Sequence, residues 1–112
     1  MENFEKVGSK AEVITEEDVR HFFEGYITAA DNYDGEDENA FESYDDIKEI
    51  IAAMDEGLYR PAFKHIESEI VRMAKIQAEL AEQGFIGDME EGMKYVNLLH
   101  GLRSYLASEG KF

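Results

Sequence analysis

The sequence contains no cysteine and no tryptophan, and only one proline among its 112 residues. Without cysteine the chain can form neither a disulfide framework nor a thiolate metal site. It has no apolar run long enough to span a membrane, and its first residues lack the basic start and apolar stretch of a signal peptide. We therefore expect a cytoplasmic protein, and the length predicts a single domain with a modest core.

Basic residues are also scarce, with 11 lysines and arginines against 26 aspartates and glutamates, for a net charge of -15. Residues 1–58 hold 18 acids against 4 bases, whereas residues 59–112 hold 8 acids against 7 bases. A negative field concentrated in one half of a chain steers basic partners toward it. The same field opposes nucleic acid and anionic membrane surfaces, so we expect neither as a direct partner.

The densest part of this field is residues 31–49, which hold nine carboxylates and a single base, Lys48. Ionised carboxylates need partners when they are buried, so this stretch must lie on the surface. Aromatic residues are interspersed among the acids and could anchor a contact within a charged rim. The predicted partner-binding residues are Asp31, Tyr33, Asp34, Glu36, Asp37, Glu38, Glu42, Asp45, Asp46 and Glu49.

Hydrophobic periodicity predicts two helices in the first half of the chain. The first begins at Thr15, where Asp18 three residues on completes a capping box, and it fades near Asn32. The second begins after Ser43, with Asp46 as its capping partner, and stops near residue 57.

Two longer helices are predicted in the second half. One has Pro61 in its first turn and runs to Gln83, where Gly84 ends it in a Schellman motif. The other begins at Asp88 as its cap, with Glu91 as the reciprocal partner. The sequence therefore predicts an all-α four-helix bundle with short loops and an acidic connection between the first two helices.

The last predicted helix is apolar on more than one face, which favours either a central position or a subunit contact. Gly92 and Gly101 lie within it, and each costs about 1 kcal/mol relative to alanine in a helix. We therefore expect a neighbouring backbone to approach closely at both glycines. Residues 1–14 are predicted to form a flexible N-terminal arm, and residues 15–112 a single helical domain.

Metal sites are not predicted. A calcium loop starting at Asp31 would place Tyr33 where a ligand is needed, and one starting at Ala30 would begin on a residue that cannot ligate. The Glu-x-x-His pairs of helical dimetal sites are absent, although three predicted helices each carry a histidine: His21, His65 and His100. No catalytic motif is present either, so we expect no cofactor and no enzyme activity.

Acids also occupy positions that local electrostatics disfavours, since Asp31 and Asp55 lie at the negative ends of predicted helices. Sequences tend to break local rules at functional sites. The leading hypothesis is a module that binds and blocks a basic, nucleic-acid-binding surface. In charge and size the chain resembles phage-encoded DNA mimics and other inhibitors of host defence nucleases, such as anti-CRISPR or anti-restriction proteins. The alternatives are a structural homodimer formed through the apolar faces of the third and fourth helices, and a metal-binding helical protein.

Overall fold

The computed structural model describes residues 13–112, so most of the predicted N-terminal arm, residues 1–12, lies outside the described residues. No strand occurs among residues 13–112. The predicted all-α architecture is confirmed as four helices: α2 (Glu16–Asp31), α3 (Tyr44–Asp55), α4 (Arg60–Gln83) and α5 (Ile86–Ser108). None of these described helices is long and apolar enough to cross a membrane.

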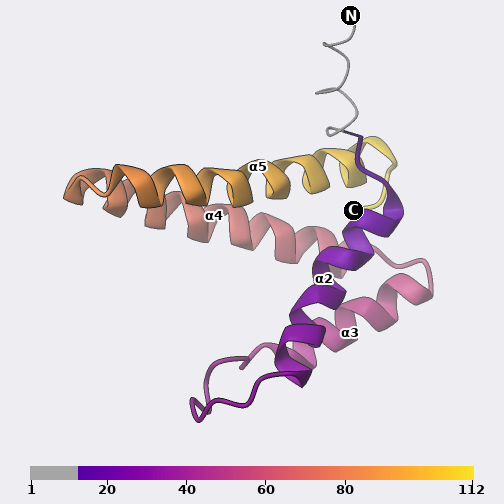
Figure 1. Cartoon of the computed structure of the whole chain (residues 1–112). Helices are drawn as coiled ribbons and strands as arrows, with labels where there is room; N and C mark the ends of the chain where they lie inside the picture. The colour runs from indigo at the N-terminus through magenta and orange to yellow at the C-terminus, as the bar shows by residue number, and fades with distance from the viewer. Residues whose placement is uncertain (1–12) are drawn as a thin grey trace, which may run out of the picture.

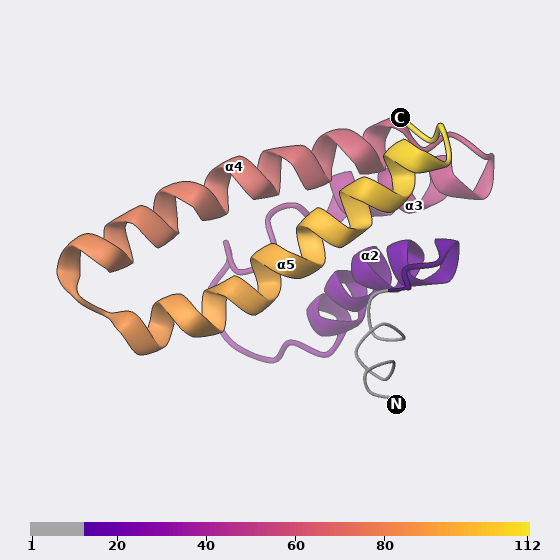
Figure 2. The ribbon, with the colours of Figure 1, turned by 90° about the horizontal axis from the view of Figure 1, so that it is seen from above.

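The four helices are arranged as two helical hairpins. α4 and α5 form a long antiparallel hairpin, and α2 and α3 form a shorter one that packs across the end of the first where α4 begins and α5 stops (Figures 1 and 2). Lys111, just past α5, closes this end by pairing with Glu16 at the start of α2, with Nζ 3.0 Å from Oε1. The opposite end of the long hairpin projects away from α2 and α3 (Figure 2).

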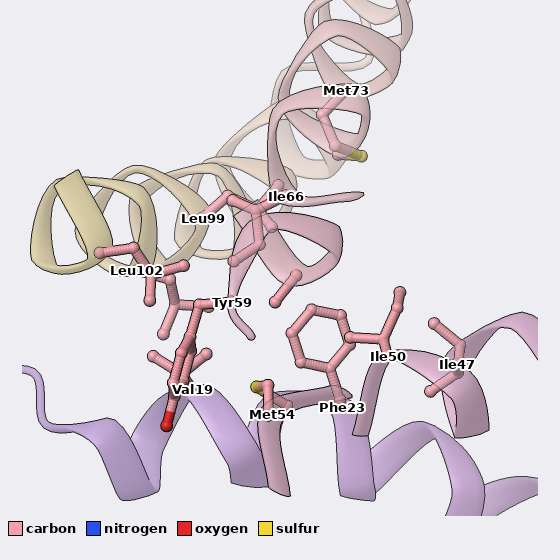
Figure 3. Close-up of a cluster of buried hydrophobic side chains, with 12 residues drawn as sticks. Val19, Phe23, Ile47, Ile50, Met54, Tyr59, Ile66, Met73, Leu99 and Leu102 are labelled. Carbon is pink, nitrogen blue, oxygen red and sulfur yellow. The ribbon is translucent and has the colours of Figure 1, made fainter. Parts of the chain in front are cut away.

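The hydrophobic core lies where the two hairpins cross (Figure 3). Phe23 from α2, Ile47 from α3 and Ile66 from α4 all belong to this core, and all three are almost fully inaccessible to solvent. α5 contributes its three buried leucines: Leu99, Leu102 and Leu106. No residue between 74 and 98 is buried, so the projecting half of the long hairpin adds no fully buried side chain to the core.

Two of the predicted helix ends are confirmed in detail. The Thr15 backbone N–H donates to Asp18 Oδ2 at 2.8 Å, and the Asp18 N–H donates to Thr15 Oγ1 at 3.3 Å, which completes the capping box. At the end of α4, Gly84 has a φ of 77°, in the left-handed region. The Phe85 N–H then donates to the Leu80 carbonyl at 2.9 Å, as a Schellman motif requires.

Two predicted helix starts are wrong in their capping. Ser43 is the N-cap of α3, but its side chain makes no capping bond and Asp46 has no reciprocal role, because the Ser43 N–H instead donates to the Tyr26 hydroxyl at 3.2 Å. α5 starts at Ile86 rather than at an Asp88 cap, because the turn at Gly84 reverses the chain at once. Asp88 lies in the first turn of α5, where a negative charge favours the helix start.

The predicted close approach of a neighbouring backbone to the glycines of α5 is also wrong. A β-carbon at Gly92 would meet the side-chain amide of Gln77, and one at Gly101 would lie 3.5 Å from Ile14 Cγ1. Both neighbours are side chains. The space at Gly92 therefore accommodates a glutamine that reaches across the hairpin, and Gly101 makes only ordinary van der Waals contact.

Candidate functional site

All nine predicted carboxylates are exposed on the outside of the shorter hairpin. Residues 31–40, the end of α2 and the following loop, are exposed throughout, as are Glu42 beyond them and the three acids in the first half of α3: Asp45, Asp46 and Glu49. The loop forms the end of the α2–α3 hairpin that lies away from the C-terminus (Figure 1). We call these nine carboxylates, on the segment 31–49, the acidic surface.

The acidic surface has no counter-charge among residues 13–112, where none of its carboxylates forms an ion pair. Its one base, Lys48, places Nζ 5.2 Å from the centroid of the Tyr44 ring. Some acids elsewhere are paired: Asp55, at the end of α3, pairs with Arg20. The unfavourable charge at that helix end is therefore compensated, whereas the charge on the acidic surface is not.

Aromatic rings support the loop from beneath. Phe41 packs edge-to-face against both Tyr26 of α2 and Tyr33 of the loop, with ring centroids 5.3 Å apart in each pair. The Tyr33 hydroxyl accepts a hydrogen bond of 3.2 Å from the Asp37 N–H, and its ring lies so close to Gly35 that any side chain there would collide with it. Tyr33, predicted as a partner contact, is 42 % exposed and packs within the loop through its other side.

Hydroxyl groups join the loop to both flanking helices. The Tyr44 hydroxyl of α3 donates to Asp31 Oδ1 at 2.8 Å, and the Tyr26 hydroxyl of α2 holds the backbone just before α3. Within the loop, the Asn39 N–H donates to Asp37 Oδ1 at 2.9 Å. These contacts anchor the loop to both helices. Tyr26 is a supporting residue that the sequence analysis did not single out, because periodicity shows burial and not the partner of a hydroxyl.

A second feature is a cavity of about 490 Å³ at the junction of the two hairpins, to which all four helices contribute. Its polar residues on α4 are spaced along one helix face, at positions 65, 69 and 72. Arg72 donates from Nε and Nη2 to the two oxygens of Glu69, at 3.0 and 2.7 Å, and the Tyr95 hydroxyl donates to Glu69 Oε1 at 3.0 Å. The lining consists of Phe22, Phe23, Tyr26, Ser43, Ile47, His65, Glu69, Arg72, Tyr95 and Leu98.

The surroundings of this cavity shift the pKa values of three of its side chains. The hydrogen bond from Arg72 lowers the pKa of Glu69 and keeps it ionised. Burial lowers the pKa of His65, and burial beside the Glu69 charge raises the pKa of Tyr95 to about 12. At neutral pH the cavity is therefore lined by one ion pair, a neutral imidazole and a neutral phenol. The sequence reasoning considered His65 only as a metal ligand and did not single out Glu69 or Arg72.

Metal binding finds no support in the geometry of residues 13–112, where no three histidine, aspartate or glutamate side chains are grouped to hold an ion. The three histidines lie on different helices and in different surroundings. His21 faces Glu17 on the surface of α2, His65 packs on Phe23, and His100 is exposed on α5. Comparison with known proteins adds no assignment, because no protein family, no curated protein and no solved structure matches the chain.

Proposed function

We propose that this protein binds a basic, nucleic-acid-binding surface of another protein and blocks it. The observation that carries the proposal is the acidic surface itself: nine exposed carboxylates, without an ion-pair partner among residues 13–112, on a loop supported by aromatic rings and on the adjoining ends of α2 and α3. A surface that only kept the protein soluble would need neither this concentration of charge nor a loop anchored to both helices.

The physical basis is substitution of carboxylates for phosphates. Proteins that bind nucleic acid place lysines and arginines along the phosphate backbone, and these contacts supply much of the affinity. A protein surface that offers the same charges competes for the same groove. Complementary fields raise the association rate, and a loop that is already ordered loses less conformational entropy on binding. Binding of this kind weakens as salt is added.

The resemblance in charge and size to phage inhibitors of host defence nucleases suggests which partner to test first. Such a nuclease has a basic groove of the required kind, and blocking that groove would stop its reaction without any catalysis by the inhibitor. The proposal does not assign the protein an enzyme activity.

The test is capture of a partner from a bacterial lysate at low and high salt, followed by a DNA-binding assay on the captured protein. The variant to compare with the natural sequence carries Asp37→Asn, Glu38→Gln, Asp45→Asn and Asp46→Asn. A matched control removes four exposed acids from the projecting half of the long hairpin: Glu79→Gln, Glu82→Gln, Asp88→Asn and Glu90→Gln.

We expect the first variant to lose capture and the control to retain it, although both have the same net charge. We also expect the captured protein to bind DNA only after the inhibitor is removed. Capture that is equally weakened by both variants would show a general effect of net charge. That result, or a captured protein that still binds DNA in the complex, would contradict the proposal.

A structural homodimer is the second candidate. It is favoured by the projecting half of the long hairpin, which has no buried residue but exposes Phe85, Ile86 and Met93. A second copy could cover these side chains. Sedimentation at micromolar concentration tests this: the natural protein should be a dimer and an Ile86→Glu variant a monomer. A natural protein that sediments as a monomer would exclude it.

A further inference from the structure

The cavity between the hairpins has the size and composition of a small-molecule site. Its volume of about 490 Å³ lies within the range of roughly 300–1,000 Å³ that such sites occupy. One side is aromatic: Phe22 stacks on Tyr95 with centroids 6.1 Å apart, and Phe22 also meets Phe23 edge-to-face. The proposed blocking of a basic partner uses none of these side chains, so the cavity could serve a different function.

The charges around the cavity favour a cation. Among the described residues, Glu69 and Arg72 are the only oppositely charged pair that lines it, and they neutralise each other through a two-pronged hydrogen bond. The nearest part of the acidic surface then sets the sign of the field. Ser43, which lines the cavity, is preceded by Glu42, and the charge of Asp46 acts on the imidazole of His65. An anion would meet this field without a free counter-charge.

Hydrogen-bond acceptors remain unused in the cavity. The Ser43 hydroxyl and the His65 ring nitrogens have no hydrogen-bond partner among the described residues, and Glu69 Oε2 accepts only from Arg72 Nε. A carboxylate oxygen can accept two hydrogen bonds, and a neutral imidazole one. Aromatic faces attract cations, and a planar cation can stack on them while its edge N–H groups donate to such acceptors.

We propose that this cavity binds a planar organic cation of the amidinium or guanidinium class. The aromatic side receives the flat face of the cation, and the acceptors along α4 and at Ser43 receive its N–H groups. Such a group could belong to a free small molecule or to an arginine side chain of another protein. The proposal is independent of the proposed blocking function, because it requires no macromolecular partner.

The experiment is an NMR titration of the full-length protein at neutral pH with three probes of one shape: benzamidine, the neutral benzamide and the anionic benzoate. A fourth probe, N-acetyl-arginine N-methylamide, presents the cation as a protein side chain would. We expect benzamidine to bind at least tenfold more tightly than benzamide, benzoate not to bind, and the shifted signals to come from Phe22, Tyr95 and Leu98. If the arginine probe binds as tightly as benzamidine, the ligand is an arginine side chain of another protein. If it binds more weakly, the ligand is a free small molecule.

Two variants test the assignment, each with a matched control. Glu69→Gln leaves Arg72 uncompensated and should abolish benzamidine binding. Its control is Glu67→Gln, also on α4 but outside the cavity, which breaks the ion pair to Arg103 of α5 and should leave binding intact. Phe22→Leu should weaken benzamidine binding about tenfold, whereas Phe63→Leu, outside the cavity, should leave it unchanged. This second pair of variants still tests the proposal if Glu69→Gln fails to fold. Benzoate or benzamide binding as tightly as benzamidine, or benzamidine shifts confined to the acidic surface, would overturn the proposal.

Discussion

Gln77 of α4 lies directly against Gly92 of α5, so that a β-carbon at position 92 would be 2.7 Å from Gln77 Oε1. Gln77 Nε2 donates to the Met89 carbonyl of α5 at 2.9 Å. This contact joins the helices in the half of the long hairpin that lacks buried residues. The contact also accounts for the polar Gln77 and the helix-destabilising Gly92, which face each other where α4 and α5 are otherwise apolar.

The first prediction concerns glycine substitution. In an open helix position, glycine to alanine gains about 0.5–1 kcal/mol. A β-carbon at Gly25 of α2 would meet nothing within 4 Å, so Gly25→Ala should raise the free energy of unfolding by that amount. Gly92→Ala should gain nothing, because the new methyl group displaces the Gln77 amide and its hydrogen bond to Met89. Urea unfolding of the two variants measures the difference.

A double-mutant cycle provides the control. In a Gln77→Ala background the obstacle is gone, and Gly92→Ala should then stabilise as much as Gly25→Ala does. The coupling between positions 77 and 92 should exceed about 0.5 kcal/mol, as is usual for residues in direct contact. Additive effects at the two positions would show that the close approach of the side chain to the glycine does not limit stability.

The second prediction concerns pH. Burial lowers the pKa of His65 in the folded state, so the folded protein binds a proton there less readily than the unfolded chain does. The neutral His65 ring therefore contributes fully to the free energy of unfolding above the ordinary histidine pKa of about 6.5. This contribution is lost as the pH falls from there through the pKa of His65 in the folded state. Groups that act on this ring include Glu69 and Arg72 from α4 and Asp46 from α3.

A His65→Gln variant isolates this effect from the titration of the carboxylates. We expect the natural protein to lose more stability than the variant between pH 7 and pH 5, measured as the difference in urea midpoint at each pH. His21→Gln is made in parallel as a control for the loss of one histidine, because His21 lies on the surface of α2 and outside the cavity. Parallel profiles for the natural protein and His65→Gln would contradict the assignment.

The third prediction is that the acidic surface destabilises the fold that carries it. Like charges without counter-ions repel, and salt screens them, with a Debye length of about 10 Å at 0.1 M and 3 Å at 1 M. Sodium chloride should raise the melting temperature of the natural protein. Glu36→Gln with Glu38→Gln should raise it at low salt and reduce its dependence on salt, since neither side chain has a partner among the described residues.

The control for charge removal is Glu67→Gln with Glu16→Gln, two acids that form ion pairs with Arg103 and Lys111. Their loss should lower the melting temperature or leave it unchanged, because favourable pairs are removed along with the charges. If both double variants were stabilised alike, net charge alone would account for the effect, and the acidic surface would have no special electrostatic cost.

How far the sequence predicts this structure depends on the range of the interaction. The Thr15 capping box and the Gly84 turn were predictable because their partners lie within five residues. The absence of a side-chain cap at Ser43 was not, since its backbone is held by Tyr26, 17 residues away. Exposure of the nine carboxylates follows from their charge. Their lack of ion-pair partners within residues 13–112, and the cavity that Arg72 helps to line, depend on how the two hairpins cross, which periodicity does not reveal.

The fourth prediction tests whether aromatic packing holds the acidic loop. Phe41 lies between Tyr26 and Tyr33, and each such aromatic pair contributes about 0.5–1.5 kcal/mol beyond simple burial. Phe41→Ala removes both contacts, so the amide protons of Asp37 and Asn39 should exchange faster with solvent while those of α4 and α5 keep their rates. Hydrogen exchange followed by NMR measures both sets in one experiment.

Phe85→Ala is the matched control for this loop, because Phe85 lies at the far end of the long hairpin and is 49 % exposed. It should leave exchange in the loop unchanged. The same Phe41→Ala variant should capture a basic partner more weakly than the natural protein although its charge is identical, since a loosened loop must be ordered again on binding. Faster exchange without weaker capture would show that the charges act without a fixed arrangement, and unchanged exchange would show that other contacts hold the loop.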